Sequence, residues 1–366
     1  MTDYFEVTYQ LTPARDESPE EKARDITLEQ TVELPAPLVP ADVARLTVGS
    51  VESLTPIGRR QWEAVIAFPM ASIGTDLTQF LNVLYGNISL KRGIRITGIR
   101  WTTELLTRFG GPGFGVEGIR RLVDAYARPI LATALKPMGL SADRLARICG
   151  DFAQGGMDII KDDHGLANQH SAPFNDRVAR CQDAVNDANA ATGGSTRYFP
   201  NVTASWPEMI RRVEVALGVG CSGVLVNPWL TGLDAMRWLR DEAGVAVMAH
   251  PALTGAYLHR SHGIAAPILL GDLFRVAGAD AVIYPNPGGR FGLSRRECET
   301  INTHLREPLG ELAPSLPTPG GGMDVATAPG WARRYGRDTI FLIGGSLYAR
   351  GDLTAATRQL REAIDA

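Results

Sequence analysis

Cysteine is scarce in this chain of 366 residues, and its spacing excludes two kinds of scaffold. The four cysteines (Cys149, Cys181, Cys221 and Cys298) lie far apart and form no Cys-x-x-Cys pair. Disulfide-framed domains and structural zinc sites both need cysteines at short, repeated spacings. We therefore expect four reduced thiols in a cytoplasmic protein.

Long apolar runs and an excess of basic charge are also lacking. No apolar stretch approaches the roughly 20 residues of a membrane-spanning helix, and the first residues do not resemble a signal peptide. The net charge is −3, and lysine and arginine are scattered along the chain. These absences predict no membrane partner and no nucleic-acid partner. An apolar content of 45% is typical of a folded globular enzyme.

Residues 1–120 are predicted to form an α+β domain, because strand-like and helix-like segments mix there without regular alternation. A Gly-Gly-Pro-Gly stretch at 110–113 indicates a connection. The expected segments are strands or extended runs at 4–11, 29–35, 61–68 and 94–101, and helices beginning near 19 and spanning 75–85.

Residues 121–366 carry a different pattern, which predicts a TIM barrel. Eight short apolar runs end in polar or glycine-rich residues, and most are followed by an amphipathic segment such as the one that opens at Ser141. Eight βα units in about 240 residues match that fold. A doubly wound sheet is the alternative, but no Gly-x-Gly-x-x-Gly opens the first unit. The predicted strands are 129–135, 157–161, 197–203, 223–227, 245–250, 281–284, 316–318 and 339–343.

The carboxyl ends of these strands carry polar residues, and this is where TIM barrels place their active sites. Glycine runs at the seventh and eighth strands predict a phosphate cradle of bare backbone N–H groups. A plain tight turn is the alternative for each run taken alone. The residues at the strand ends are Lys136, Lys161-Asp162-Asp163-His164, Asn201 with Thr203, Asn227, His250, Tyr284 with Asn286, Gly320-Gly321-Gly322 and Gly344-Gly345-Ser346.

The second of these ends is the most informative segment of the chain. Strand alternation places Lys161 and Asp163 on one face and Asp162 on the other. Burying such charges is costly unless they are paired or bind a metal. A structural lysine–aspartate ion pair is the simpler interpretation of this motif in isolation.

Taken together, the motifs resemble the RuBisCO superfamily, and in particular its RuBisCO-like (form IV) proteins. The matching pieces are Ala134-Leu135-Lys136-Pro137-Met138-Gly139, Gly155-Gly156-Met157-Asp158-Ile159-Ile160-Lys161-Asp162-Asp163, Leu84-Tyr85-Gly86-Asn87 and the paired glycine runs. The resemblance implies a ferredoxin-like α+β domain before the barrel, and a homodimer. It also implies that Glu29 and Asn87 of one subunit complete the partner's site.

The resemblance further implies that Lys161 takes up CO₂ to form a carbamate, which binds Mg²⁺ together with Asp163. The third ligand, normally glutamate, is His164 here, and imidazole suits other divalent metals better than Mg²⁺. His164 is therefore a metal ligand, an acid/base group, or part of a site that works without metal. Lys136 is the expected base, because a lysine buried near other cationic groups has a lowered pKa. His250 is expected to orient a substrate hydroxyl or phosphate, with a satisfied core histidine as the alternative.

Departures from the family pattern argue against a bisphosphate substrate and against CO₂ fixation. Met138 replaces a second active-site lysine, Pro251 and Thr254 replace an arginine and a histidine, and Gly320 replaces a serine. The first phosphate site remains, formed by Gly321, Gly322, Gly344, Gly345 and Ser346.

The expected activity is enolisation of a phosphorylated ketose through a metal-stabilised enediolate, as an isomerase of 5-methylthioribulose 1-phosphate. The alternatives are a diketone-phosphate enolase, a decarboxylase or transcarboxylase of a 3-oxo sugar-acid phosphate, and a non-catalytic binding protein.

Overall fold

A computed structural model describes residues 4–365, which divide into two compact units. The first unit is built from three stretches of the chain, namely residues up to 110, 253–269 and 309–311. The second unit comprises 111–252, 270–308 and the residues from 312 onward. The Gly-Gly-Pro-Gly stretch at 110–113 therefore contains the first crossing between the two units.

The first unit holds a five-stranded mixed sheet in the order β10-β4-β1-β3-β2. On β1, alternate residues are buried, and Phe5 packs against Phe80 of α3 with ring centroids 5.3 Å apart. The main elements of this unit are β1 (Tyr4–Leu11), α1 (Pro19–Glu29), α2 (Ala41–Thr47), β2 (Ser50–Gly58), β3 (Gln61–Pro69), α3 (Leu77–Tyr85), β4 (Ile94–Arg100), α4 (Thr103–Phe109) and β10 (Gly263–Ile264).

One predicted strand of this unit is wrong and another was missed. The extended run expected at 29–35 does not form, because a capping box at Ser18 starts α1, which continues to Glu29. The chain then turns, with Glu33 at a φ of 55°. The missed strand, β2, is exposed along most of its length and so lacks the apolar alternation that marks a half-buried strand.

The second unit is a barrel of eight parallel strands in the order β7-β6-β5-β13-β12-β11-β9-β8. Leu225 of β8 donates to Pro200 O and accepts from Val202 N–H, at 2.9 and 3.0 Å, and these bonds close the barrel. All eight predicted strands are confirmed. They are β5 (Ile130–Leu135), β6 (Ile159–Asp162), β7 (Arg197–Phe199), β8 (Gly223–Val226), β9 (Ala246–Ala249), β11 (Ala281–Pro285), β12 (Leu316–Gly320) and β13 (Ile340–Leu342).

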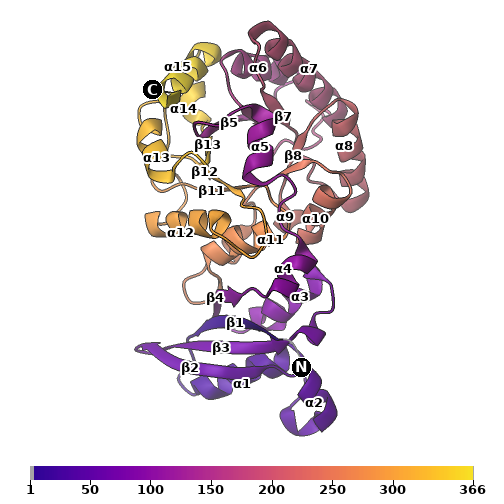
Figure 1. The fold of residues 1–366 in the computed structure, drawn as a ribbon, viewed down its shortest axis with the longest axis vertical. Helices are drawn as coiled ribbons and strands as arrows, with labels where there is room; N and C mark the ends of the chain where they lie inside the picture. The colour runs from indigo at the N-terminus through magenta and orange to yellow at the C-terminus, as the bar shows by residue number, and fades with distance from the viewer. Residues whose placement is uncertain (1–3, 366) are drawn as a thin grey trace. The chain divides into compact units, whose positions relative to one another are not determined.

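Helices surround these strands (Figure 1). Serine side chains cap two of them, Ser141 at α6 as expected and Ser294 at α12. They are α5 (Gly115–Val123), α6 (Ala142–Gln154), α7 (Phe174–Thr192), α8 (Trp206–Gly218), α9 (Pro228–Thr231), α10 (Leu233–Asp241), α11 (Phe274–Val276), α12 (Arg295–Arg306), α13 (Ala328–Tyr335), α14 (Gly345–Tyr348) and α15 (Leu353–Asp365).

Helix α5 closes the amino-terminal end of the barrel. Its residues Val116, Ile119 and Val123 belong to the same buried cluster as the inward-facing residues of the strands. Asp280, just before β11, accepts the backbone N–H groups of Phe114 and Gly115 and so fixes the start of this helix. The opposite end, where the predicted site residues lie, is therefore the end available for chemistry.

Candidate active site

The charged side chains at the end of β6 point to opposite faces of the strand, as strand alternation predicts. The carboxylate of Asp162 turns outward and accepts hydrogen bonds from the Tyr198 hydroxyl at 2.7 Å and the Asn201 backbone N–H at 2.9 Å. Arg177 of α7 pairs with the same carboxylate at 3.1 Å, and both side chains are fully buried. Asp162 thus anchors the end of β6 to the helix layer, while Lys161 and Asp163 face the other way.

Lys161 is buried, with 1% of its surface exposed, and its Nζ donates to the backbone carbonyl of Asp162 at 3.1 Å. Burial lowers the pKa of Lys161 to about 8, and the charge of Lys136 acts in the same direction. The negative charge of Asp163 opposes this shift. At pH 7 about a tenth of the amine is therefore neutral, far more than for a lysine of ordinary pKa, and a neutral amine is the form that reacts as a nucleophile.

Asp163 is the acidic centre of the cluster. Its Oδ1 lies 3.0 Å from Lys136 Nζ and 3.5 Å from His164 Nδ1. Burial alone would raise the pKa of Asp163, but the His164 hydrogen bond and the charges of Lys161 and Lys136 hold it well below its usual range. Asp163 is therefore ionised throughout the neutral range.

The premise that Lys136 is buried is wrong. Its side chain is 38% exposed and pairs with Asp163, because Lys136 follows β5 at the open rim. The lysine whose pKa burial lowers is Lys161. Lys136 still belongs to the cluster, because it forms an ion pair with Asp163 at the exposed rim of the barrel.

His250 lies against His164, with parallel rings whose centroids are 4.5 Å apart. Burial lowers the pKa of His250 well below 6.5, and the positive charge of Lys161 adds to this effect. Its Nδ1 accepts the backbone N–H of Ala252 at 3.1 Å. The neutral ring must then carry its hydrogen on Nε2, which makes His250 a hydrogen-bond donor at that atom.

The two glycine runs are joined by Ser346, whose hydroxyl donates to the Met323 carbonyl at 3.1 Å. Gly321 and Gly322 have φ angles of 89° and 67°, and a Cβ on Gly322 would lie 3.0 Å from Gly289 N. The positive φ angles alone account for glycine at these two positions, without any phosphate contact. A Cβ on Gly345, at the start of α14, would meet nothing within 4 Å, so its backbone can be approached closely.

In the first unit, the structure brings Glu29 and Asn87 together. Asn87 Nδ2 donates to Glu29 Oε1 at 3.2 Å, and Lys91 Nζ donates to Glu29 Oε2 at 2.8 Å. These hydrogen bonds, that from Lys91 first, lower the pKa of Glu29. The two residues thus form one polar cluster, although 58 positions separate them in sequence.

Sequence reasoning did not identify the residues that hold the strand ends in place. Arg177 and Tyr198 gave no local signal, because each comes from a different segment and meets Asp162 only in the folded barrel. The pairing of Thr203 with Asn227 was also missed, although both residues stand at predicted strand ends.

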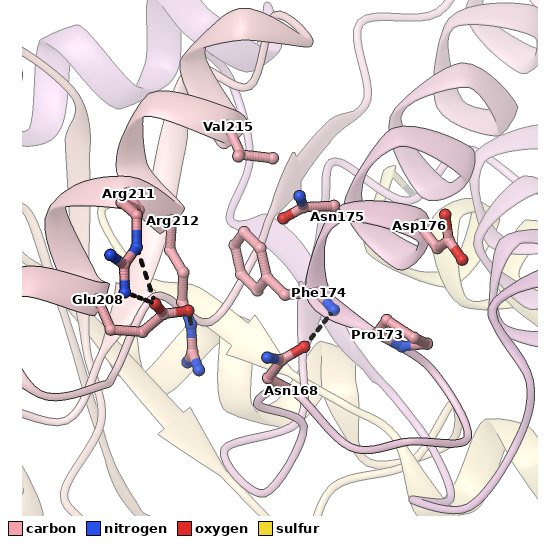
Figure 2. Close-up of a pocket in the computed structure, with 9 residues that line it drawn as sticks. All are labelled: Asn168, Pro173, Phe174, Asn175, Asp176, Glu208, Arg211, Arg212 and Val215. Carbon is pink, nitrogen blue, oxygen red and sulfur yellow. Dashed lines mark hydrogen bonds and ion pairs between the residues drawn. The ribbon is translucent and has the colours of Figure 1, made fainter.

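An open hollow of about 360 Å³ lies between α7 and α8 (Figure 2). No predicted site residue lines it. Its floor is Phe174, and Glu208 on one wall pairs with both Arg211 and Arg212. Because its carboxylate and guanidinium groups largely satisfy one another, we assign this hollow no catalytic role.

A divalent cation fits the cluster only if Lys161 supplies an oxygen ligand. Among residues 4–365, no group of three or more histidine, cysteine, aspartate or glutamate side chains is arranged to hold a metal. Asp163 and His164 provide two donors. Conversion of the Lys161 amine to a carbamate would add the carboxylate that a hard cation prefers, and its lowered pKa suits that conversion.

Comparison with known proteins agrees with this architecture. Residues 115–289 match the family model of the ribulose bisphosphate carboxylase large chain, catalytic domain. The chain is 41% identical to a 5-methylthioribulose-1-phosphate isomerase from Rhodospirillum rubrum, over 98% of this chain and 95% of that protein. It is 32% identical to a putative 2,3-diketo-5-methylthiopentyl-1-phosphate enolase from Shouchella clausii, over 82% and 81%.

A solved structure, the RuBisCO-like protein from Rhodopseudomonas palustris, superposes with a TM-score of 0.90 at 37% identity. The match covers 99% of this chain and 97% of that one. Within residues 4–365, no helix has the length and apolar character needed to cross a membrane. On its sequence and its fold, the chain belongs to the ribulose bisphosphate carboxylase large-chain family, as one of its RuBisCO-like proteins.

Proposed function

We propose that this protein is an isomerase that acts on 5-methylthioribulose 1-phosphate and does not fix CO₂. The observation that carries the proposal is the cluster in which Lys161, Asp163, His164, Lys136 and His250 meet at the open end of the barrel. The 41% identity to an isomerase of this name, over nearly the whole chain, supports the choice of substrate.

The reaction moves a carbonyl along the sugar chain, and this requires one proton to leave a carbon and another to return to its neighbour. Lys136, whose Nζ lies 3.0 Å from Asp163 at the open rim, takes the proton from the carbon beside the substrate carbonyl. His250 donates its Nε2–H to a substrate hydroxyl and so orients the sugar for this proton transfer. Return of a proton to the former carbonyl carbon, with transfer of the hydroxyl proton of its neighbour to the former carbonyl oxygen, completes the isomerisation with no net change in atoms.

Lys161, as a carbamate, together with Asp163 and His164 would hold Mg²⁺ or another divalent cation. Such a cation, when bound, polarises a carbonyl oxygen. Proteins of this family commonly use Mg²⁺ and a lysine carbamate. The ionised Asp163 suits the binding of the cation, and the partly neutral Lys161 suits the formation of the carbamate.

The substrate phosphate is bound by the backbone of Gly321, Gly322, Gly344 and Gly345 with Ser346. The open approach at Gly345 supports this assignment most directly. A single phosphate fits the departures from the family pattern, since Met138, Pro251 and Gly320 lack the side chains of a second phosphate site.

A cytoplasmic homodimer completes the proposal. Glu29 and Asn87 of one subunit reach the partner's barrel, and their preformed cluster with Lys91 would present an oriented carboxylate and amide.

The second candidate is a 2,3-diketo-5-methylthiopentyl-1-phosphate enolase, which the similarity to the Shouchella clausii protein favours. The same proton removal beside a carbonyl serves that reaction. Only the substrate and the site of proton return differ.

Product analysis by NMR distinguishes the candidate functions. We expect the purified protein, with Mg²⁺ and bicarbonate, to convert 5-methylthioribulose 1-phosphate into a rearranged pentulose phosphate and to leave the diketone phosphate unchanged. Turnover of the diketone alone would identify the enolase. Release of CO₂ from a 3-oxo acid phosphate would identify the decarboxylase, and binding without turnover of any of them would indicate a non-catalytic protein.

A further inference from the structure

A buried polar atom at the end of β8 has no role in the site described so far. Asn227 is 1% exposed, and within the described residues its Oδ1 has no hydrogen-bond partner. A buried acceptor without a donor is rare, because it loses its water and gains nothing in return. Such an atom calls for an explanation.

The amide of Asn227 is held in one orientation. Its backbone N–H and its Nδ2 both donate to Thr203 Oγ1, at 2.9 and 2.8 Å. Because Nδ2 is turned toward Thr203, Oδ1 points away from it. The unpaired acceptor is therefore positioned before any ligand arrives.

Strand geometry places Asn227 beside His250. Leu225 belongs to the buried cluster inside the barrel, and Asn227 follows it by two positions, so both face the interior. Val226 pairs with Ala249, and His250 N–H donates to Val226 O at 2.8 Å. Asn227 and His250 are thus neighbours on adjacent strands, about 4.8 Å apart along the sheet. The pair offers one acceptor, Oδ1, and one donor, Nε2–H.

An unpaired buried atom alone does not make a site, and the same strand shows this. Ser222, just before β8, also has a buried Oγ without a partner in the described part of the chain. It lies at the closed end of the barrel, next to the core that α5 covers. Asn227 differs because it lies at the open end, in the same layer as His250.

We propose that Asn227 is a specificity-determining residue that recognises one hydroxyl group of the substrate. The hydroxyl donates to Asn227 Oδ1 and accepts from His250 Nε2–H, which satisfies both atoms at once. A hydrogen or a methylene in place of that hydroxyl would leave Asn227 unpaired. The inference rests on the proposed function only in taking a polyhydroxylated sugar phosphate as the ligand.

The test measures binding, so that it does not depend on turnover. The probes are 5-methylthiopentitol 1-phosphates, in which the ketone is reduced, and the analogues that lack one hydroxyl each. Calorimetric titration in the presence of Mg²⁺ gives Kd for the wild type and for Asn227→Ala, Thr203→Val and Ser222→Ala. Thr203→Val releases the amide while keeping Oδ1, and it decides the matter if Asn227→Ala does not fold.

We expect Asn227→Ala to weaken binding of the full pentitol about tenfold to a hundredfold. One deoxy analogue should bind the wild type and this variant equally, and Thr203→Val should show a smaller loss with the same hydroxyl preference. Ser222→Ala should bind like the wild type. An unchanged Kd in Asn227→Ala, or an equal loss for every analogue, would overturn the inference.

Two further outcomes separate this inference from the proposed function. If the hydroxyl preference appears but the wild type turns over no ketose phosphate, the proposed isomerase fails and the role of Asn227 stands. If the wild type turns over the ketose phosphate but binds none of the pentitols, the role of Asn227 is overturned and the proposed isomerase stands.

Discussion

At the scale of single residues, the burial of Lys161 shapes the chemistry of the site more than any other feature. A lysine side chain with 1% of its surface exposed resists protonation, and its pKa falls to about 8. Asp163 beside it stays ionised, because His164, Lys161 and Lys136 all favour its charged form. The site thus pairs a lysine that loses its proton readily with a carboxylate that never gains one near neutral pH.

The first prediction concerns the reactivity of Lys161 toward CO₂. Only the neutral amine reacts, and a group with a pKa of about 8 is mostly protonated at pH 7 and mostly neutral at pH 9. At fixed dissolved ¹³CO₂, the rate of carbamate formation should therefore rise about tenfold between these pH values and then level off. The measurement is the ¹³C NMR signal of the carbamate carbonyl.

Lys161→Arg provides the control, because arginine keeps the charge and forms no carbamate; its spectrum should lack the signal. A rate that still climbs steeply above pH 9 would show an ordinary lysine pKa and contradict the account.

At the scale of elements, β6 is held by a network that the sequence does not reveal locally. The Asp162 carboxylate forms an ion pair with Arg177 of α7. It also accepts hydrogen bonds from the Tyr198 hydroxyl of β7 and from the Asn201 backbone N–H in the following turn. Asn201 Nδ2 also donates to the carbonyls of His164 and Leu166, both at 2.9 Å. This network fixes where the strand ends, and hence where Lys161 and Asp163 point.

The second prediction is that Asp162→Asn destabilises the barrel strongly. Asp162 and Arg177 are both fully buried, and removing one partner of such a pair costs about 3–5 kcal/mol of unfolding free energy. Urea unfolding followed by circular dichroism measures the loss. Arg180→Gln is the matched control, because it breaks the exposed pair with Asp143 and should cost about 1 kcal/mol or less. Equal losses in the two variants would argue against the network.

The predictability of the elements follows from their burial. The eight barrel strands could be predicted because parallel strands are covered on both faces and appear as short apolar runs. Strand β2 could not, since its residues are mostly exposed. At the site, alternation correctly separated Lys161 and Asp163 from Asp162. The orientation of Asn227, however, depends on Thr203, 24 positions away, and no local pattern encodes that contact.

At the scale of the whole molecule, the proposed dimer gives Glu29 and Asn87 a role that their position within one chain does not explain. Asn87 donates to Glu29 and also to Glu33, at 3.2 and 2.8 Å, so it is held by two glutamates at the end of α1 and in the turn that follows. If the site is shared between subunits, the activity of each barrel in a mixed dimer depends on Glu29 and Asn87 of the other chain.

The third prediction uses this dependence. Lys161→Met and Asn87→Ala homodimers should each be nearly inactive. The first lacks Lys161 in its own barrel, and the second lacks the Asn87 side chain that each subunit supplies to its partner's barrel. Mixed dimers should regain activity, because one of their two barrels is intact and faces an intact Asn87. The assay compares co-expressed and separately purified proteins. If the mixture stays as inactive as its components, Glu29 and Asn87 do not complete a partner's site.

The most direct test of the central claim is proton exchange. The protein is incubated in D₂O with 5-methylthioribulose 1-phosphate, with and without Mg²⁺ and bicarbonate, and the sugar is followed by NMR. The account predicts deuterium at a carbon that takes part in the carbonyl shift, together with a rearranged pentulose phosphate, and predicts that Lys161→Met abolishes both. Retention of every carbon-bound proton by an unchanged substrate, in the presence of metal and bicarbonate, would contradict it.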